Sequence, residues 1–394
     1  MKKTFLILLT LFNVISSFSQ DSITIGSKHH IFSKALNEER NFWIYLPPDY
    51  DNKKFAPAKY PVVYLLDAEN NFHSYTGIQH SLAKGPYAMI PQMIVVGITN
   101  TDRTRDLTPT ESNRDAFYDK GKKFFKQSGG NKNFITFLET ELRPYIDSHY
   151  RTSGYNILNG HSFGGLTAVN ILLHHTKLFN AYTIIDPSLW WDNEIMIKKA
   201  DSIFKNKDFN NHSIYVAMAN KISIPQDTTT DMARGIRKFE KLLESKIPSN
   251  LRWAFKYYEN EDHGTIPIPA EYDGLRFIFK DHLVKVKEAV QNPSLVEEQY
   301  AKLSKATGFI FLPSESYLDW MGNFCLEREK TDSALAFFQM AKMYYSNSSN
   351  VFISLGQCYE KKGNKTQAQL SYKKALLLSP ENKKVITFLK NLNN

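Results

Sequence analysis

The chain carries the sequence Gly160-His-Ser-Phe-Gly-Gly165 between two apolar runs. A short run from Tyr155 to Asn159 precedes it, and a helix-compatible run from Leu166 to Leu173 follows it. This order predicts a strand, a sharp turn and a helix, with the Oγ atom of Ser162 pushed out of the sheet edge. We expect glycine at 160 and 164 because a Cβ at either position would collide with the turn. The stretch therefore predicts an α/β fold with a nucleophilic serine; the simpler alternative is a glycine-rich turn.

A nucleophilic serine needs a base, and in the hydrolase arrangement the base follows it in the chain. The histidines downstream of the serine are His174, His175, His212, His263 and His282. Only His263 falls in a loop directly after a strand-like run, Leu251 to Tyr258, and such loops build the sites of open α/β sheets. His282 falls in a helix-like run from Leu275 to Val290. We therefore predict His263 as the base, with a solvated loop histidine as the alternative.

The acid that would orient this base is less sharply defined. One strand-like run, Ala181 to Ile185, ends at Asp186, which is our first choice although Asp-Pro also favours a simple turn. A second run, Ser213 to Met218, ends near Asn220, where no acid stands. The alternatives are Asp227, Asp231 and a Ser–His dyad without an acid. An acid would fix the tautomer of the histidine and stabilise its charged form.

Further segments give the chain a resemblance to a known family. They are Tyr60 to Asp67, Val96 to Asn100, Arg103 to Pro109, Gly160 to Gly165, Pro187 to Trp191 and Asp262 to Gly264. In this order they resemble the putative esterase (esterase D-like) family over about residues 33 to 282, nearest the branch that opens ferric-siderophore trilactones. The resemblance implies an α/β-hydrolase fold, with a mostly parallel sheet flanked by helices, and ester hydrolysis by Ser162 and His263. The chain departs from many relatives at Asn220, which leaves the third member of the triad open.

Two backbone N–H groups are expected to bind the developing oxyanion. One belongs to Phe163, the residue after the nucleophile. The other should come from the loop after the strand-like run Pro61 to Leu66, where Asp67, Ala68 and Glu69 are the candidates. The resemblance favours Ala68. If the loop has no such role, Asp67 only caps the strand.

Candidate substrate contacts follow two other strand-like runs. Arg103 and Arg105 could bind an anionic acyl or catecholate group through a planar guanidinium, but an internal ion pair is the alternative for Arg105. Trp190 and Trp191 could form an aromatic wall near the nucleophile, or they could pack in the core. The substrate classes to compare are a ferric-siderophore trilactone, an acyl or feruloyl sugar ester, and a small thioester. Export of the protein would disfavour the thioester.

The composition fits a well-packed chain of more than one domain. Its 394 residues are 42% hydrophobic and 13% aromatic, with a formal net charge of +9. The lysines form no dense block, and no segment resembles a nucleic-acid-binding module. The cysteines, Cys325 and Cys358, are too few for a disulfide framework, and no cysteine–histidine cluster has metal-ligand spacing. We therefore predict no metal, no cofactor and no nucleic-acid partner.

Residues 1–19 have the features of a secretory signal. Two lysines precede an apolar run from Phe5 to Val14, and Ser17-Phe-Ser19 suits cleavage before Gln20. The apolar run is too short to span a bilayer. We therefore predict an exported protein, periplasmic or secreted, without a membrane span.

The last hundred residues lose the strand pattern and contain a repeat at an offset of 34 residues. The matched pairs are Gly322 with Gly356, Ala334 with Ala368, Phe338 with Tyr372, and Ala341 with Ala375. Small residues where two helices cross, with large ones filling the gap, are typical of tetratricopeptide repeats. A segment from Lys383 to Leu392 would form a capping helix. Such repeats would dock a protein partner; the alternative is a stabilising appendage or a dimer contact.

Together these observations predict four segments. They are a signal peptide at 1–19, an α/β-hydrolase esterase domain at 20–285, a helical linker at 286–310 and a small all-α tetratricopeptide-repeat domain at 311–394. The predicted function is that of an exported serine esterase, which hydrolyses a small-molecule ester. The alternative is a non-catalytic scaffold with a hydrolase fold that presents the repeats to a protein. The presence of both Ser162 and His263 favours the enzyme.

Overall fold

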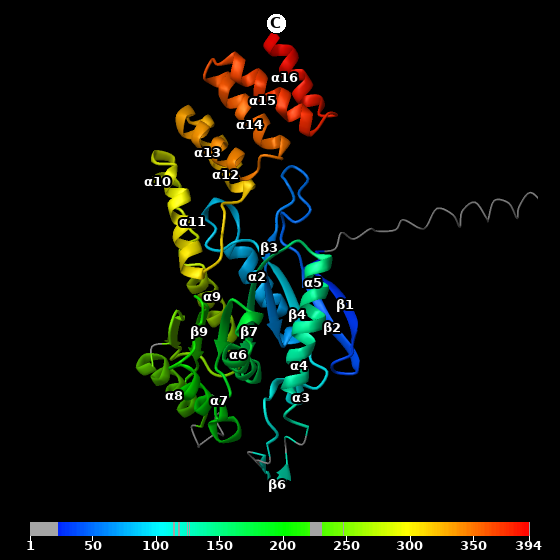
Figure 1. Cartoon of the computed structure of the whole chain (residues 1–394), viewed down its shortest axis with the longest axis vertical. Helices are drawn as coiled ribbons and strands as arrows, with labels where there is room; N and C mark the ends of the chain where they lie inside the picture. Colours follow the sequence, from blue (N-terminus) through cyan, green and yellow to red (C-terminus); the bar gives the residue numbers. More distant parts are fainter. Residues whose placement is uncertain are drawn as a thin grey trace, which may run out of the picture.

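The chain folds around a large sheet, with a helical part standing at one end of it (Figure 1). The computed structural model describes residues 23–112, 115–116, 119–123, 125, 127–220, 231–246 and 248–393. The predicted signal peptide at 1–19 lies outside these residues. Within the described part of the chain, no helix has the length and apolar character needed to cross a membrane.

The sheet has the strand order β1-β2-β4-β3-β7-β8-β9-β10. The bounds are Ser27–Ser33 (β1), Glu38–Tyr45 (β2), Tyr60–Leu66 (β3), Ile94–Ile98 (β4), Thr152–His161 (β7), Ala181–Ile185 (β8), Ser213–Met218 (β9) and Arg252–Tyr257 (β10); Asp115–Ala116 (β5) and Asp119–Lys123 (β6) pair separately. The strands from β4 to β10 run parallel, and β1 and β2 add an antiparallel edge. The α/β fold expected from the sequence, with a mostly parallel sheet, is confirmed, and the antiparallel edge makes the whole sheet mixed.

The central strands read as continuous apolar runs because helices cover both faces of the sheet. Every residue of β3, β4 and β8 is buried. The helices and helical turns of this part are Ala68–Leu82 (α2), Gly85–Tyr87 (η2), Arg103–Leu107 (α3), Asn131–Phe137 (α4), Leu138–Leu142 (η3), Arg143–His149 (α5), Phe163–His174 (α6), Thr176–Leu178 (η4), Trp191–Ile203 (α7), Asp231–Lys246 (α8) and Pro267–Ile278 (α9). Residues of α4 to α8 share one hydrophobic core, whereas α2 and α9 pack on the other face.

The C-terminal part consists of helices within the described residues. Their bounds are Val286–Gln291 (α10), Ser294–Thr307 (α11), Glu315–Glu327 (α12), Thr331–Tyr344 (α13), Ser349–Lys361 (α14), Lys365–Leu378 (α15) and Lys383–Asn393 (α16). The repeat detected in the sequence has a geometric basis in the two helix pairs. A Cβ on Gly322 would lie 2.3 Å from the Phe338 ring, and a Cβ on Gly356 would lie 2.3 Å from the Tyr372 ring. Each glycine therefore lets an aromatic ring of the next helix approach closely.

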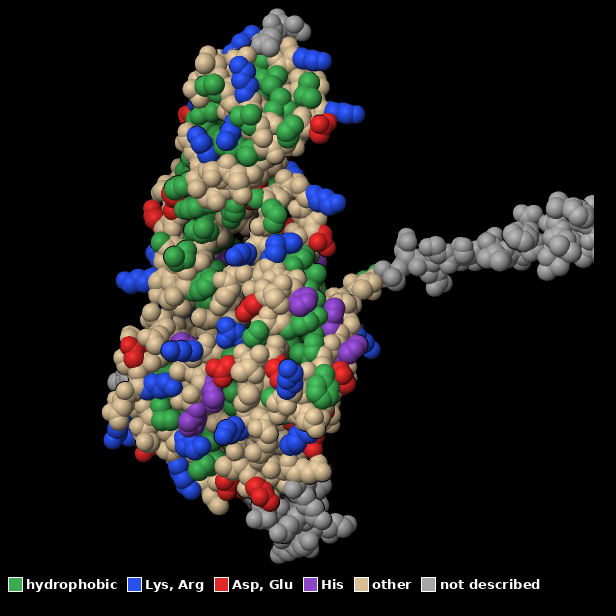
Figure 2. Space-filling view, turned by 45° about the vertical axis from the view of Figure 1, so that its right-hand side comes forward, with side chains coloured by type: hydrophobic (Ala, Val, Ile, Leu, Met, Phe, Trp, Pro, Cys, Tyr) green, Lys and Arg blue, Asp and Glu red, His purple; other side chains and the backbone are tan. Residues whose placement is uncertain are grey.

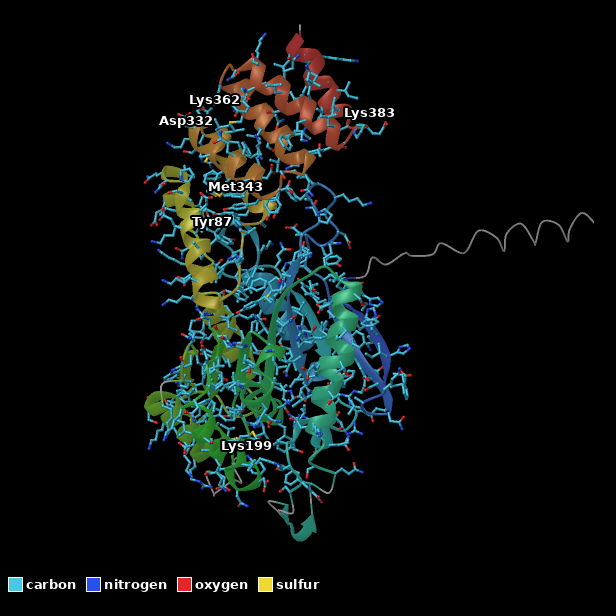
Figure 3. The ribbon with its side chains drawn as sticks, viewed as in Figure 1. Tyr87, Lys199, Asp332, Met343, Lys362 and Lys383 are labelled. Atoms are coloured by element: carbon cyan, nitrogen blue, oxygen red, sulfur yellow. The ribbon has the colours of Figure 1, made fainter. Side chains whose placement is uncertain are left out.

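Neighbouring helix pairs are also joined on the surface. Lys362, just after α14, forms an ion pair with Asp332 of α13 (Figure 3). The sulfur atoms of Cys325 and Cys358 are both buried and unbridged. On the face seen in Figure 2, lysine and arginine side chains are scattered among acidic and apolar ones.

The helical part packs directly onto the sheet part. Phe311 lies 5.1 Å from Tyr155 of β7 and 5.8 Å from Phe279, measured between ring centroids. The side chain of Glu315 also accepts a hydrogen bond from the N–H of Ala56, at 2.9 Å. The hydrophobic core on the α2 and α9 side of the sheet therefore continues into the C-terminal helices.

One expected element is wrong. The helix-like run from Leu275 to Val290 is divided, because α9 ends at Ile278 and α10 begins only at Val286. His282 lies between them and is buried. Its Nδ1 contacts the carbonyl of Ala88 at 3.2 Å and its Nε2 contacts the Tyr300 hydroxyl at 3.2 Å. These tertiary contacts hold the segment in a turn in place of a continuous helix.

Candidate active site

The turn between β7 and α6 holds Ser162 in a strained backbone conformation. Its φ is 60° and its ψ is −115°, a region that non-glycine residues rarely adopt and that clusters at functional sites. A Cβ on Gly160 would lie 2.3 Å from the carbonyl oxygen of Gly164, so glycine is needed at 160. The expectation for Gly164 is wrong, because a Cβ there would meet nothing closer than 3.4 Å. The crowded position is Gly165, where a Cβ would lie 2.9 Å from Pro187.

The segment after β8 supports this turn from the side. The N–H of Ser162 donates to the carbonyl of Ile185 at 3.0 Å, and the N–H of Ser188 donates to the carbonyl of Ser162 at 3.1 Å. The two serine Oγ atoms lie 3.3 Å apart, within hydrogen-bond range. The position of Ser162 is therefore tied to the loop that carries Asp186.

His263 lies against Asp186. The Nδ1 atom of the imidazole is 2.6 Å from Oδ2 of the carboxylate, while Oδ1 accepts the N–H of Ala219 at 3.0 Å. The Asp186 side chain is 2% exposed and the His263 side chain 21%, so the acid is enclosed and the imidazole faces outward. Asp186 itself has a φ of 38°, in the left-handed region that non-glycine residues rarely adopt.

Of the other candidate acids, Asp231 is within the described residues. Asp231 forms an ion pair with Arg234 on its own helix, at 2.6 Å. Asp227 lies outside the described residues. Asn220, at the position where the resemblance led us to look for an acid, donates its N–H to the carbonyl of Glu261 and its side chain to the carbonyl of Glu259, at 2.8 and 2.9 Å. Both hydrogen bonds join Asn220 to the segment that precedes His263.

His161 is a member of the site that the sequence reasoning did not single out. Its ring centroid lies 4.4 Å from that of His263. Burial, followed by the neighbouring His263, lowers the pKa of His161 to about 4, so its imidazole is neutral near pH 7. The available signal was its position directly before Ser162 at the end of a buried strand.

The predicted oxyanion donors are the first residues of two helices. Phe163 begins α6 and Ala68 begins α2, so the N–H of each lies in a first turn, where backbone donors have no partner within the helix. The two helix starts lie close together, because a Cβ on Gly164 would be 3.6 Å from Oδ2 of Asp67. Asp67 has a left-handed φ of 55°, which sets the direction in which α2 begins.

Arg103 forms hydrogen bonds with Asp67 and with the end of β7. Its Nε and Nη2 atoms donate to the two carboxylate oxygens of Asp67 at 2.6 and 2.9 Å, and Nη2 also reaches the carbonyl of His161 at 3.3 Å. The guanidinium carbon lies 5.3 Å from the centre of the Phe163 ring. Arg103 therefore links the start of α2 to the end of β7.

Arg105, the predicted substrate contact, is engaged inside the protein. Its guanidinium donates to both carboxylate oxygens of Glu38, at 3.0 and 2.6 Å, and to Asp106 at 2.7 Å. Asp106 is buried and also pairs with the buried Arg40. The hydrogen bonds that Arg105 donates to Glu38, the largest cause, and to Asp106 raise the pKa of its guanidinium. The structure thus places Arg105 in the internal pairing that was its alternative.

The two tryptophans pack beside the turn. Trp191 is fully buried, lies 5.2 Å from the Phe163 ring and donates its indole N–H to the carbonyl of Thr110 at 3.2 Å. Trp190 is 7% exposed and lies 6.3 Å from Phe163. Trp190 lines a cavity with a volume of about 920 Å³.

That cavity has a polar, charged lining. Beyond Trp190 it is lined by Asp192, Asn193 and Glu194, which have left-handed φ values of 47°, 52° and 62°. Lys198 also lines it. Three successive non-glycine residues in this conformation form an unusual tight turn, which exposes their polar side chains to the cavity.

The fold and this arrangement of side chains define an α/β protein of the hydrolase kind. The family described as "Putative esterase" matches residues 33–263, and the chain belongs to that family. Within the described residues, no group of three or more histidine, cysteine or acidic side chains could hold a metal ion.

Three relatives illustrate the likeness. The crystal structure of an IroE-like serine hydrolase from Shewanella oneidensis is 32% identical, with a TM-score of 0.74, covering 81% of this chain and 99% of its own. The ferri-bacillibactin esterase of Bacillus subtilis is 27% identical over 260 residues, 62% of this chain and 87% of its own. An uncharacterised protein from Capnocytophaga ochracea, 17% identical, shares the fold over 93% of this chain and 99% of its own, with a TM-score of 0.60. The comparisons support an ester hydrolase.

Proposed function

We propose that the protein is a serine esterase that hydrolyses carboxylic esters through an acyl-enzyme on Ser162. The observation that carries the proposal is the enclosed hydrogen bond between His263 and Asp186 beside a strained serine turn. An acceptor on Nδ1 keeps the proton of a neutral imidazole on that nitrogen, which leaves Nε2 as the base. Membership of the esterase family supports the same chemistry.

In the proposed reaction, Nε2 of His263 takes the proton of Ser162 as Oγ bonds to the ester carbonyl carbon. The oxyanion that forms is stabilised by the N–H groups of Phe163 and Ala68. His263 then gives the proton to the leaving alcohol, and the acyl group stays on Ser162. Water, deprotonated by the same imidazole, releases the acid and restores the serine. Asp186 stabilises the imidazolium in both halves.

The proposed substrate is a siderophore ester of the trilactone kind. The name of the Bacillus subtilis relative states a ferri-bacillibactin substrate, and that of the Shewanella oneidensis structure an IroE-like hydrolase. An acyl or feruloyl sugar ester is the second candidate. It is favoured by the polar cavity that Trp190 lines, because the carboxylate, amide and cationic groups there can hydrogen-bond a hydroxylated ring. Ser162 and His263 are not among the residues that line this cavity.

We also propose that the protein is exported, with residues 1–19 removed, and that the C-terminal helices are tetratricopeptide repeats that bind a protein partner. The paired contacts Gly322–Phe338 and Gly356–Tyr372 support the repeat assignment. The intact mass of the protein from cell envelope or culture supernatant tests the export: a chain starting at Gln20 is expected. Full-length protein confined to the cytosol would contradict it.

A fluorophosphonate probe tests the enzyme against the alternative of a non-catalytic scaffold. The wild-type protein is expected to label, and Ser162→Ala is expected to abolish labelling. Ser188→Ala is the matched control, because it removes the hydroxyl 3.3 Å away and leaves the nucleophile in place. Labelling that persists in Ser162→Ala, or its absence from the wild type, would reject the serine mechanism. A panel of p-nitrophenyl esters, feruloyl sugars and a catecholate trilactone then separates the substrate classes.

A further inference from the structure

A buried carboxyl group lies beneath the candidate active site and takes no part in the proposed reaction. Glu271 of α9 has no exposed surface. Its Oε1 accepts a hydrogen bond from Nδ2 of Asn159 on β7, at 3.1 Å. Its Oε2 is buried without a hydrogen-bond partner among the described residues. A fully buried acid is costly when ionised, so this arrangement calls for a physical account.

Helix α9 packs against three neighbouring strands of the sheet at one register position. Asn159 is in register with Thr183 of β8, which is in register with Tyr215 of β9. A Cβ on Gly274 would lie 2.7 Å from the Thr183 methyl group and 3.3 Å from the Tyr215 ring. Glycine at 274 therefore lets α9 lie close to these strands, and Glu271, three residues earlier, reaches Asn159.

The hydrogen bond joins the two segments that carry the proposed nucleophile and base. Asn159 precedes Ser162 by three residues on the same strand and turn. His161 follows Asn159 by two residues, so it shares its face of the sheet, and its ring contacts that of His263. Helix α9 in turn begins at Pro267, four residues after His263. The Glu271–Asn159 hydrogen bond thus connects the strand that ends at His161 to the helix that begins shortly after His263.

The surroundings favour a neutral acid. The titratable groups on α9 and the elements beside it are Glu69, His73, Tyr75 and His80 of α2, Tyr155 and His161 of β7, Tyr182 of β8, Tyr215 of β9 and, on α9 itself, Tyr272, Asp273 and Arg276. Burial raises the pKa of Glu271 to about 8, against the opposing effect of the hydrogen bond from Asn159. A neutral carboxyl group offers one donor and one acceptor side, as a glutamine amide does.

We propose that Glu271 is a positioning residue, which ties β7 to α9 through its hydrogen bond with Asn159 and so fixes the His161–His263 pair beside Ser162. The proposal rests on the serine esterase function proposed above. It assigns to Glu271 no contact with the substrate. The proposal predicts that glutamine at position 271 preserves the activity of the protein and that leucine does not.

The kinetic test compares E271Q and E271L on a short p-nitrophenyl ester. E271Q is expected to keep kcat within about twofold, whereas E271L is expected to lower kcat about tenfold or more with little change in KM, because a small misplacement of the base slows the reaction. E315Q and E315L are matched controls, since Glu315 is a buried acid of α12 whose carboxylate is bonded to Ser348 and Ala56. Above pH 8, the kcat of the wild type should fall relative to that of E271Q. A folded E271L with normal kcat, or an E271Q as impaired as E271L, would overturn the proposal.

A second readout does not depend on turnover. NMR titration of histidine-labelled protein gives the imidazole chemical shifts and apparent pKa of His263 in each variant. We expect E271L to change both and E271Q and E315L to leave them unchanged. Unchanged His263 signals in E271L would refute the positioning role even if the protein proves to hydrolyse no ester. Changed signals in a protein without esterase activity would instead leave the positioning role standing and reject the proposed function.

Discussion

The Nδ1 atom of His263 lies 2.6 Å from Oδ2 of Asp186, although 77 positions of sequence separate the two residues. The pair bridges a strand, because Asp186 follows β8, His263 follows β10, and β9 lies between them. Asp186 also accepts the N–H of Ala219 at the end of that middle strand. The acid thus enters the site from β8, and the loop after β9 supplies a supporting backbone donor and Asn220.

If Ser162 and His263 act as one unit, removing either should abolish turnover. Ser162→Ala and His263→Ala are each expected to lower kcat on the order of 10³-fold or more, and the double variant should be no slower than the worse single variant. Steady-state kinetics on an activated ester, with circular dichroism to confirm folding, checks this. Losses that multiply in the double variant would show that the two residues act independently.

Asp186→Asn should lower kcat on the order of 10²-fold or more, because the amide no longer stabilises the imidazolium or fixes its tautomer. Asp231→Asn is the control, since that carboxylate pairs with Arg234 on its own helix. It should retain activity close to that of the wild type. The opposite ranking would move the acid to the later loop.

Stability should decrease on acidification through a histidine remote from the site. Burial lowers the pKa of His282 to about 4, below the value of about 6.5 in the unfolded chain. Between these values the unfolded state binds the proton and the folded state does not, so stability falls as the pH drops from about 6.5 to 4. His282→Gln should therefore lose less of its melting temperature than the wild type between pH 7 and 5. Thermal melts measure this, with the partly exposed His175→Gln as a control; parallel curves for the wild type and His282→Gln would contradict it.

The place of truncation should decide whether the sheet part folds alone. A chain of residues 20–290 loses Phe309 and Phe311, which cover Tyr155 and Phe279, and is expected to aggregate. A chain of residues 20–313 keeps these rings and should hydrolyse a short p-nitrophenyl ester. Size-exclusion chromatography and kcat/KM of the two chains provide the comparison. A soluble, fully active 20–290 chain would show that the helical part contributes nothing to the core of the sheet part.

The strands were predictable because parallel strands buried on both faces appear in the sequence as short continuous apolar runs. Residues Ser213–Met218 and Ala181–Ile185 form strands with the bounds expected from their apolar runs. The serine turn was equally local, since its glycine spacing and flanking runs lie within about twenty residues. The interruption at His282 was not predictable, because the helix-like pattern there is broken by contacts with Ala88 and Tyr300.

The candidate site could be predicted only in part, because its contacts also join segments that lie far apart in the chain. The sequence favoured Asp186 because it ends a strand-like run, but it left Asp227, Asp231 and a Ser–His dyad open, since the distance from a carboxylate to an imidazole depends on strand order. It offered Arg105 as a substrate contact, whereas the fold places Glu38, from the antiparallel edge of the sheet, against that guanidinium. His161 left only its position directly before Ser162 as a signal, and Glu271 left none, because its partner Asn159 comes from a different element.

By itself, the sequence determined what local spacing encodes: the buried strands, the turn at Ser162, the loop histidine at 263 and the 34-residue repeat of small and aromatic positions. The tertiary structure alone decided which acid meets His263, which arginine is engaged internally and where the core of the sheet continues into the helices. The physical reason is that propensity and periodicity act between near neighbours in the chain. Ion pairs, hydrogen bonds and burial depend instead on strand order and on the approach of helices, which bring together residues that lie far apart in the chain.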